Sequence, residues 1–159
     1  MIKDDTKQAI TFLAWLTAII IVLYFLLLAI FYKASKPERS QVQEINALAL
    51  SKTPIKHIEK NYHLNRGINS YALKGQVKKQ SYYFIYLPGS KKAYLFPANK
   101  GVSEHVVRNK FSGKRANYSI IKVNLGWYKK QAVWEVTAKD QANRYTYQLY
   151  EFKNGKLLG

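Results

Sequence analysis

The pattern of hydrophobic and polar positions separates one long apolar run from a series of shorter periodic segments. The run covers residues 9–32 and contains no charged side chain. A helix of this length is roughly 36 Å long, which is enough to cross a hydrocarbon core of about 30 Å. The apolar part of a cleaved signal peptide is shorter, about 7–15 residues, and precedes a small-residue cleavage site that "IFYKASKPE" lacks. We therefore expect an uncleaved transmembrane anchor.

The charges around this run do not determine its orientation. Lys3 and Lys7 precede it, and Lys33, Lys36 and Arg39 follow it, which weakly favours a cytoplasmic C-terminal side. Long domains, however, are translocated largely regardless of such charges. The charge pattern therefore leaves both orientations open.

Residues 35–50, "SKPERSQVQEINALAL", have the pattern of an amphipathic helix that follows a break near Lys33–Lys36. Ser35 and Glu38 have the spacing of a capping box, so each side chain can bond to a free backbone N–H at the helix start. The apolar positions recur at helical spacing, at Val42, Ile45, Leu48 and Ala49. Four segments between turn residues then predict strands, at Ile55–Leu64, Ile68–Val77, Ser81–Leu87 and Ala93–Phe96.

The same order of elements then begins again. Ser103 can cap a second helix that Gly113 ends, with three residues facing inward, Val106, Val107 and Phe111. Asn154-Gly155 predicts a two-residue hairpin, because a type I′ turn needs positive φ at both positions. The strands predicted in this part are Tyr118–Leu125, Ala132–Ala138, Arg144–Phe152 and Lys156–Leu158.

The two parts of the soluble chain resemble each other at an offset of 63 residues, which aligns "YALKGQVKKQSYYFIYLPGSKKAYL" with "WEVTAKDQANRYTYQLYEFKNGKLL". Tyr71 then aligns with Trp134, and Leu73 with Val136. We predict an α+β fold with two modules, each a helix packed on an antiparallel sheet. The expected divisions are a tail at 1–8, the anchor at 9–32, a first module at 33–99 and a second module at 100–159.

The strand "SYYFIYL" is apolar or aromatic on both of its faces. One face is expected to pack on the helix of its own module, and the other on the second module or on a partner. Each module has about 60 residues, which is near the lower limit for a stable single core. Packing the two modules together would bury more apolar surface than either could bury alone.

The soluble part carries the whole positive charge of the protein, which is formally +17 at pH 7. All but two of the 26 Lys and Arg residues, and all but two of the 9 Asp and Glu residues, follow the apolar run. Such a surface attracts anionic wall polymers or lipid headgroups. Nucleic acid would be attracted too, but no nucleic-acid-binding motif is present. The lysine pairs fall in predicted turns, at 78–79, 91–92 and 129–130.

Two residue patterns could indicate chemistry, and neither predicts an active site. Ser119 and Lys122 have the spacing of a penicillin-binding nucleophile, but they are expected on opposite faces of a strand, without partner motifs. His57, Glu59 and His63 would share one strand face, but the ends of this set are about 20 Å apart, too far to hold one metal ion. We therefore predict no catalytic residue, no cofactor and no metal. The chain also has no cysteine.

Two segments resemble a known family. Trp134, Glu135, Val136, Glu151 and Gly155 are similar to the C-terminal hairpin of PepSY-like domains. The order of anchor, helix and two tandem cystatin/PepSY-like modules resembles the TseB-like cell wall elongation regulators of Gram-positive bacteria over essentially the full length. "SYYFIYLPGSKKAYLF" and "WEVTAKD" are the most specific parts of this resemblance.

The resemblance implies a single-pass protein of the cell membrane, with residues 1–8 in the cytoplasm and residues 33–159 outside. It also implies a non-enzymatic role beside a class B penicillin-binding protein. Two alternatives stay open, a PepSY/cystatin-like inhibitor of an extracellular protease and a receptor for an anionic wall polymer.

Aromatic side chains are the expected contacts with a protein partner, because interfaces favour Tyr and Trp. Trp134 is expected to point inward, so its loss would unfold the second module. Trp127, beside the turn at 129–130, is the better surface candidate. The full set of candidate partner-binding residues is Trp127, Lys129, Lys130, Tyr83 and Tyr86.

Overall fold

The computed structural model describes residues 2–158, and the side chains of residues 7–33 and 39–158. The chain forms two compact units, residues 1–41 and 42–159. Helix α1 (Ile2–Lys52) makes up the first unit and contributes its last residues to the second. Within α1, Lys7–Lys33 is long and apolar enough to cross a membrane, with a mean hydropathy of 2.8.

The predicted break near Lys33–Lys36 is wrong, because α1 is helical through these positions. Proline disfavours a helix interior by about 3 kcal/mol, so the helix continues through Pro37 against the local preference. The capping box predicted for Ser35 and Glu38 lies outside the described side chains.

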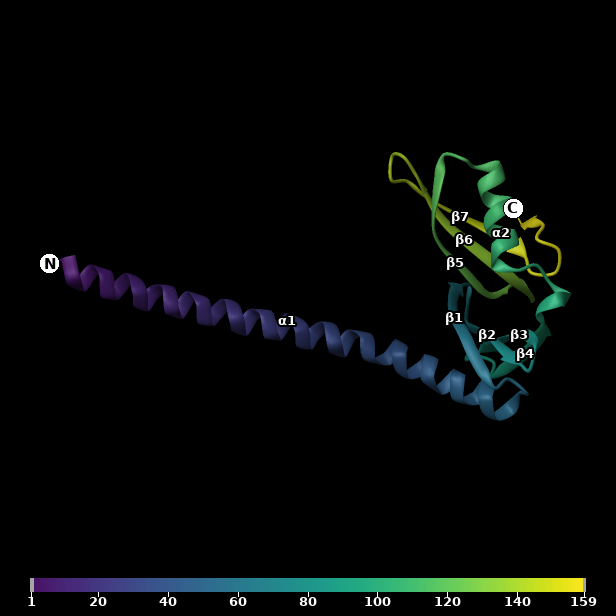
Figure 1. Ribbon diagram of the computed structural model, residues 1–159, viewed down its shortest axis with the longest axis horizontal. Coiled ribbons are helices and arrows are strands. Elements are labelled where there is room, and N and C mark those ends of the chain that lie inside the picture. Colours follow the sequence, from purple (N-terminus) through teal and green to yellow (C-terminus); the bar gives the residue numbers. More distant parts are fainter. Residues whose placement is uncertain (1, 159) are drawn as a thin grey trace. The chain divides into compact units, whose positions relative to one another are not determined.

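Two antiparallel four-stranded sheets make up most of the second unit, each with its strands in sequence order (Figure 1). The first sheet contains β1 (His57–Arg66), β2 (Ile68–Val77), β3 (Gln80–Leu87) and β4 (Lys92–Pro97). The short 3-10 helix η1 (Ala98–Lys100) and helix α2 (Glu104–Lys114) lead to the second sheet. That sheet contains β5 (Tyr118–Tyr128), β6 (Gln131–Asp140), β7 (Tyr145–Glu151) and β8 (Leu157–Leu158). The predicted α+β class is confirmed.

The two sheets repeat each other in detail. Strands β2 and β6 have 10 residues each and lie 63 positions apart in the chain. Each is opposed by a strand with a bulge at the same place, between Ile58 and Lys60 in β1 and between Ile120 and Lys122 in β5. The register of the third strand differs by one residue between the sheets. Tyr71 pairs with Tyr86, whereas Trp134 pairs with Tyr150 rather than with Leu149, because the β6–β7 turn is longer than the β2–β3 turn.

One hydrophobic core joins the two sheets. It includes Tyr83 and Ile85 of β3 together with Leu125, Trp134 and Val136 of the second sheet. Val107 and Phe111 of α2 are buried in the same core, as predicted. The inner face of "SYYFIYL" therefore packs on the second sheet, and this expected contact is confirmed.

The opposite face of the first sheet packs on the end of α1. Ile45 and Ala49 of the helix bury Tyr71, Leu73 and Phe84 of the sheet. Val136, which lies 63 positions after Leu73, shares a core with Val107 and Phe111 of α2. Each sheet thus has a helix against the equivalent face. The apolar helix positions predicted from the 3.6-residue period supply this contact.

Strand β5 is an edge strand, and one buried hydroxyl group of the first sheet bonds to its backbone. Ser70 of β2 is fully buried; its Oγ donates to the Leu64 carbonyl at 3.0 Å and accepts from the Trp127 N–H at 3.0 Å. Gly126 makes this approach possible, since a Cβ there would lie 2.4 Å from Leu64 Cβ. Arg66 of β1 also forms an ion pair with the buried Glu135 of β6.

Three local predictions are wrong. Val106 points outward, with 37% of its surface exposed, and α2 continues past Gly113 to Lys114. In the last hairpin, positive φ occurs at Gly155 but not at Asn154, so the turn is not type I′. The Gly155 N–H donates instead to the Glu151 carbonyl in a wider loop, which the Lys110 amine supports through two carbonyl oxygens. A tertiary contact thus overrides the local turn preference.

Candidate functional site

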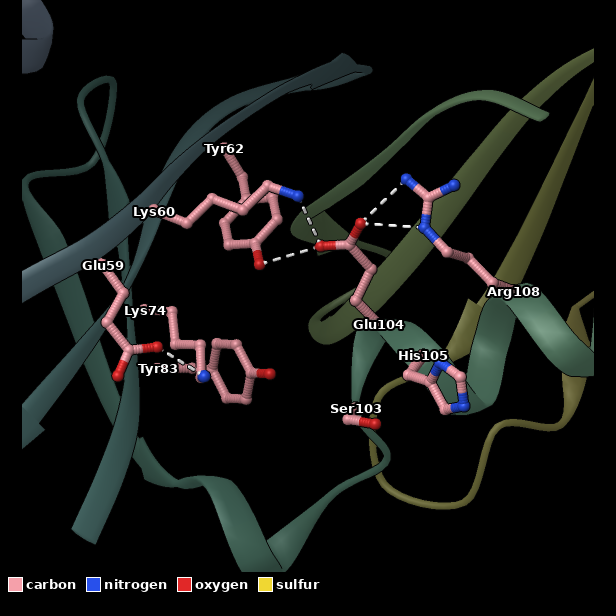
Figure 2. Close-up of a pocket in the computed structure, with 9 residues that line it drawn as sticks. All are labelled: Glu59, Lys60, Tyr62, Lys74, Tyr83, Ser103, Glu104, His105 and Arg108. Carbon is pink, nitrogen blue, oxygen red and sulfur yellow. Dashed lines mark hydrogen bonds and ion pairs between the residues drawn. The ribbon is translucent and has the colours of Figure 1, made fainter. Parts of the chain in front are cut away.

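A cavity of about 500 Å³ lies where the start of α2 meets the inner face of the first sheet (Figure 2). Strands β1, β2 and β3 supply the residues on one side of it, and α2 those on the other. The cavity is lined by Glu59, Lys60, Tyr62, Lys74, Tyr83, Ser103, Glu104, His105 and Arg108.

Glu104 is at the centre of this cluster, in the first turn of α2. Its Oε2 accepts from Lys60 Nζ at 2.6 Å and from the Tyr62 hydroxyl at 3.1 Å. Its Oε1 accepts from Arg108 Nε at 3.0 Å and from a second guanidinium nitrogen at 2.9 Å. Figure 2 shows Lys60 and Tyr62 reaching from β1 to the carboxylate, with Arg108 on its other side.

The protonation of Glu104 follows from these contacts. Burial raises the pKa of its carboxyl, but hydrogen bonds from Lys60 and Arg108 outweigh burial and hold that pKa below its usual value of 4.5. The helix start also favours a negative charge at this position, and the N-cap Ser103 accepts a hydrogen bond from the Val106 N–H. Glu104 is therefore ionised, and both of its carboxylate oxygens accept hydrogen bonds from neighbouring side chains.

Two buried tyrosines form the floor of the cavity. The rings of Tyr62 and Tyr83 meet the Trp134 ring edge to face, with centroids 5.4 and 5.5 Å apart. Burial, and then the charge of Glu104, raise the pKa of both phenols, to about 12 for Tyr83. Both phenols are consequently neutral at physiological pH. Tyr62 thus contacts both the charged cluster, through its hydroxyl group, and the core shared by the two sheets, through its ring.

Glu59 and Lys74 form a further ion pair of the cavity, with Lys74 Nζ 2.5 Å from Glu59 Oε2. The hydrogen bond from Lys74 lowers the pKa of Glu59 below its usual value. Both carboxylates of the cavity thus have cationic partners. The ion pairs and hydrogen bonds of this cluster hold α2 against β1 of the first sheet.

The bulge in β1 overturns the prediction that His57, Glu59 and His63 share one face. His57 pairs with Gln76 and His63 with Tyr71, which point to opposite faces of β2. His63 bonds to Asn69 at 2.7 Å and stacks on Tyr71. Among the residues that the structure describes, no group of three His, Cys, Asp or Glu residues could hold a metal ion.

The bulge in β5 has the reverse effect on Ser119 and Lys122. Ser119 pairs with Lys139 and Lys122 with Thr137, so both lie on one face of the sheet, contrary to the prediction. Both side chains are exposed to solvent. An inserted residue changes the face of every position beyond it, and neither bulge has a signal in the sequence pattern.

The predicted partner-binding residues do not form one surface. Trp127 is only 8% exposed and stacks on Tyr94 with ring centroids 4.1 Å apart, so its expected surface position is wrong. Strand β5 extends to Tyr128, and its alternation turns Trp127 inward with Val123 and Leu125. Tyr83 is also buried, and Tyr86 is half-buried.

Lys129 and Lys130 are exposed, as predicted for a turn. Trp134 is fully buried, as predicted, and its indole N–H donates to the Val102 carbonyl at 2.9 Å. Two exposed tyrosines that were not among the predicted residues, Tyr145 and Tyr147, lie together on β7. The sequence places both tyrosines on one face of an alternating strand. It does not show which face of that strand is left uncovered.

Comparison with known proteins identifies relatives of this chain. No family model matches it. It is 25% identical over 155 residues to "Probable cell wall elongation regulator TseB" from Bacillus subtilis (strain 168), covering 96% of both chains. The solved structure of the YpmB protein from Bacillus subtilis superimposes with a TM-score of 0.62 and 25% identity, over 74% of this chain and 93% of that one.

The chain is TseB/YpmB-like. The predicted resemblance to the TseB-like family is thereby confirmed. The TseB/YpmB-like fold accounts for the tandem sheets, and the similarity to TseB extends across the apolar helix because it covers nearly the whole chain.

Proposed function

We propose that this protein is a membrane-anchored, non-catalytic regulator of cell wall elongation that acts by contact with a class B penicillin-binding protein. One observation carries the proposal, namely the similarity to the B. subtilis regulator over 96% of both chains. Similarity of that extent covers the apolar helix and both sheets together, so the proposal concerns the whole architecture rather than one motif.

The apolar segment Lys7–Lys33 supports the anchoring part of the proposal. Anchoring two proteins in one bilayer raises the concentration of each near the other, so a weak contact between them can suffice. The shared core supports a contact role, because it makes residues 42–159 one compact body that can present a surface. Ion pairing of both cavity carboxylates supports a role other than acid–base catalysis.

The partner is tested in membranes that contain the full-length, affinity-tagged protein. After mild crosslinking, recovered penicillin-binding proteins are detected with a fluorescent penicillin. We expect recovery of a class B enzyme by the wild type, and also by a variant whose anchor is replaced with an unrelated transmembrane helix. Failure of the wild type to recover any penicillin-binding protein would refute the proposed contact. If the wild type recovered the enzyme and the anchor-replaced variant did not, the contact would lie in the membrane-spanning segment.

The non-catalytic part is tested with Ser119→Ala, Lys122→Ala and His57→Ala. Each position is exposed, so these changes should leave the fold and the cell-elongation phenotype unchanged. The measurement is cell length in a strain that depends on the variant protein. A variant that is folded and abundant, yet unable to support elongation, would point to chemistry at that residue.

Binding to an anionic wall polymer or to lipid headgroups is a second candidate function. It is favoured by the exposed lysines in or beside three hairpin turns, Lys78, Lys79, Lys91, Lys92, Lys129 and Lys130. Electrostatic binding is screened by salt, so cosedimentation with purified cell walls should fall steeply between about 0.05 and 0.3 M salt. Equal cosedimentation with walls stripped of their anionic polymer would argue against it.

A further inference from the structure

A second cavity opens on the opposite face of the first sheet from the charged cluster. Its volume is about 400 Å³, and it lies between the end of α1 and the strands β3 and β4. Its apolar lining comes from Leu48, Pro54, Phe84, Tyr86, Ala93 and Leu95. We call it the β4 groove.

The register of the first sheet explains why the β4 groove exists. Leu73, Phe84 and Leu95 form one row across β2, β3 and β4. The end of α1 buries Leu73 and Phe84, but Leu95 at the end of the row is 37% exposed. The helix therefore covers the centre of this face and leaves its β4 side open, with Ala93 beside Leu95 in the alternation.

Strand β4 is also the outer strand of its sheet. Among the described strands, β4 pairs with β3 alone, so its other edge has no strand beside it. An open edge of this kind is a template for an added strand. A strand added there would place alternate side chains over the groove, as Ala93 and Leu95 are now placed.

The charges around the β4 groove are positive. Lys52 and Lys91 line it, and Lys92 is exposed at the start of β4. No acidic residue lines the groove, and no described acidic side chain pairs with these three lysines. A lysine at the start of an edge strand also disfavours edge-to-edge pairing with a second copy. Complementarity instead favours a strand that carries carboxylates.

We propose that the β4 groove binds an extended, acidic segment of a protein partner, which adds to β4 as a fifth strand. Apolar side chains at alternate positions of that segment would contact Tyr86 and Leu95, and its carboxylates would lie beside Lys52 and Lys91. Tyr86 thereby acquires a contact role in this groove, on the opposite face of β3 from the buried Tyr83. The identity of the partner as a membrane-bound synthase rests on the proposed function.

The test uses the full-length protein in detergent micelles and a fluorescent peptide, Glu-Ser-Val-Ser-Val-Ser-Glu, whose valines and glutamates lie on one face of an extended strand. We expect the double variant Lys52→Glu, Lys91→Glu to weaken binding at least tenfold in fluorescence anisotropy. The matched control, Lys114→Glu with Lys153→Glu, makes the same change in net charge at exposed positions away from the groove and should stay within twofold. Leu95→Asn, which leaves the charge unchanged, should weaken binding about fivefold.

Several results would overturn the proposal. Absence of binding by the wild type would do so, as would equal weakening by the groove and control pairs, which would indicate general charge attraction. Self-association of the wild type that Leu95→Asn abolishes would assign the groove to a second copy of this chain.

Recovery of penicillin-binding proteins with the same variants separates the two proposals. If the wild type recovers none but binds the peptide through the groove, the groove inference stands and the proposed function fails. If the groove variants lose peptide binding but recover the enzyme normally, the proposed function stands and the groove is not its contact surface.

Discussion

Ser70 shows how one side chain can join two sheets. Its hydroxyl satisfies the Leu64 carbonyl and the Trp127 N–H at once, in a fully buried position. Ser70→Ala would leave both backbone groups without this partner, so we expect a loss of about 1–3 kcal/mol in the free energy of unfolding. Urea titration of the full-length protein in detergent measures it. Ser119→Ala, at an exposed position, is the control and should change stability by less than about 0.5 kcal/mol.

Glu104 makes stability depend on pH. Because its pKa is lower in the folded protein than in the unfolded chain, its contribution is present above pH 4.5 and is lost as the pH falls through the lower, folded pKa. Glu104→Gln should therefore be less stable than the wild type at pH 7, and the difference should shrink at acid pH. The measurement is the free energy of unfolding between about pH 7 and pH 3. A constant difference would show that the charge of Glu104 is not responsible.

At the scale of elements, the β5–β6 hairpin has the type I′ turn that was expected in the last hairpin. Lys129 and Lys130 have φ of 44° and 65°, although both carry side chains that disfavour this conformation. Lys130→Gly should raise the free energy of unfolding by up to about 1 kcal/mol, because glycine suits the second position. It keeps Lys129 over the Tyr128 ring. Thermal unfolding measures the effect.

Lys79→Gly is the control for the turn prediction. Lys79 occupies the β2–β3 turn without a positive φ, so glycine should give no gain there and should slightly destabilise the protein. Equal stabilisation by both changes would mean that relief of the left-handed conformation is not the cause.

At the scale of the whole molecule, the testable property is membrane topology. We expect residues 1–8 in the cytoplasm and residues 33–159 outside, so protease added to intact protoplasts should digest the soluble part. A cytoplasmic marker protein should survive the same treatment, and digestion after lysis confirms that the protease is active. Full protection of the soluble part in intact protoplasts would reverse the orientation.

The sequence by itself determined the features that depend on neighbouring residues. Strand β2 was predicted at Ile68–Val77, as observed, and Trp134 was predicted to point inward. Ser103 is the N-cap of α2, as predicted. The offset of 63 residues between the two similar segments of the sequence is also the offset between β2 and β6. Alternation, capping and turn residues act within a few positions, so they leave a record in the local pattern.

Only the tertiary structure decided which faces meet. The bulges at 58–60 and 120–122 reversed the expected faces of His63 and Lys122, because one inserted residue changes the face of all that follow. Trp127 is buried because the first sheet covers β5. Two of the partners of Glu104, Lys60 and Tyr62, come from a strand 44 and 42 positions away. The burial of such residues depends on contacts between distant segments, and a linear pattern carries no record of those.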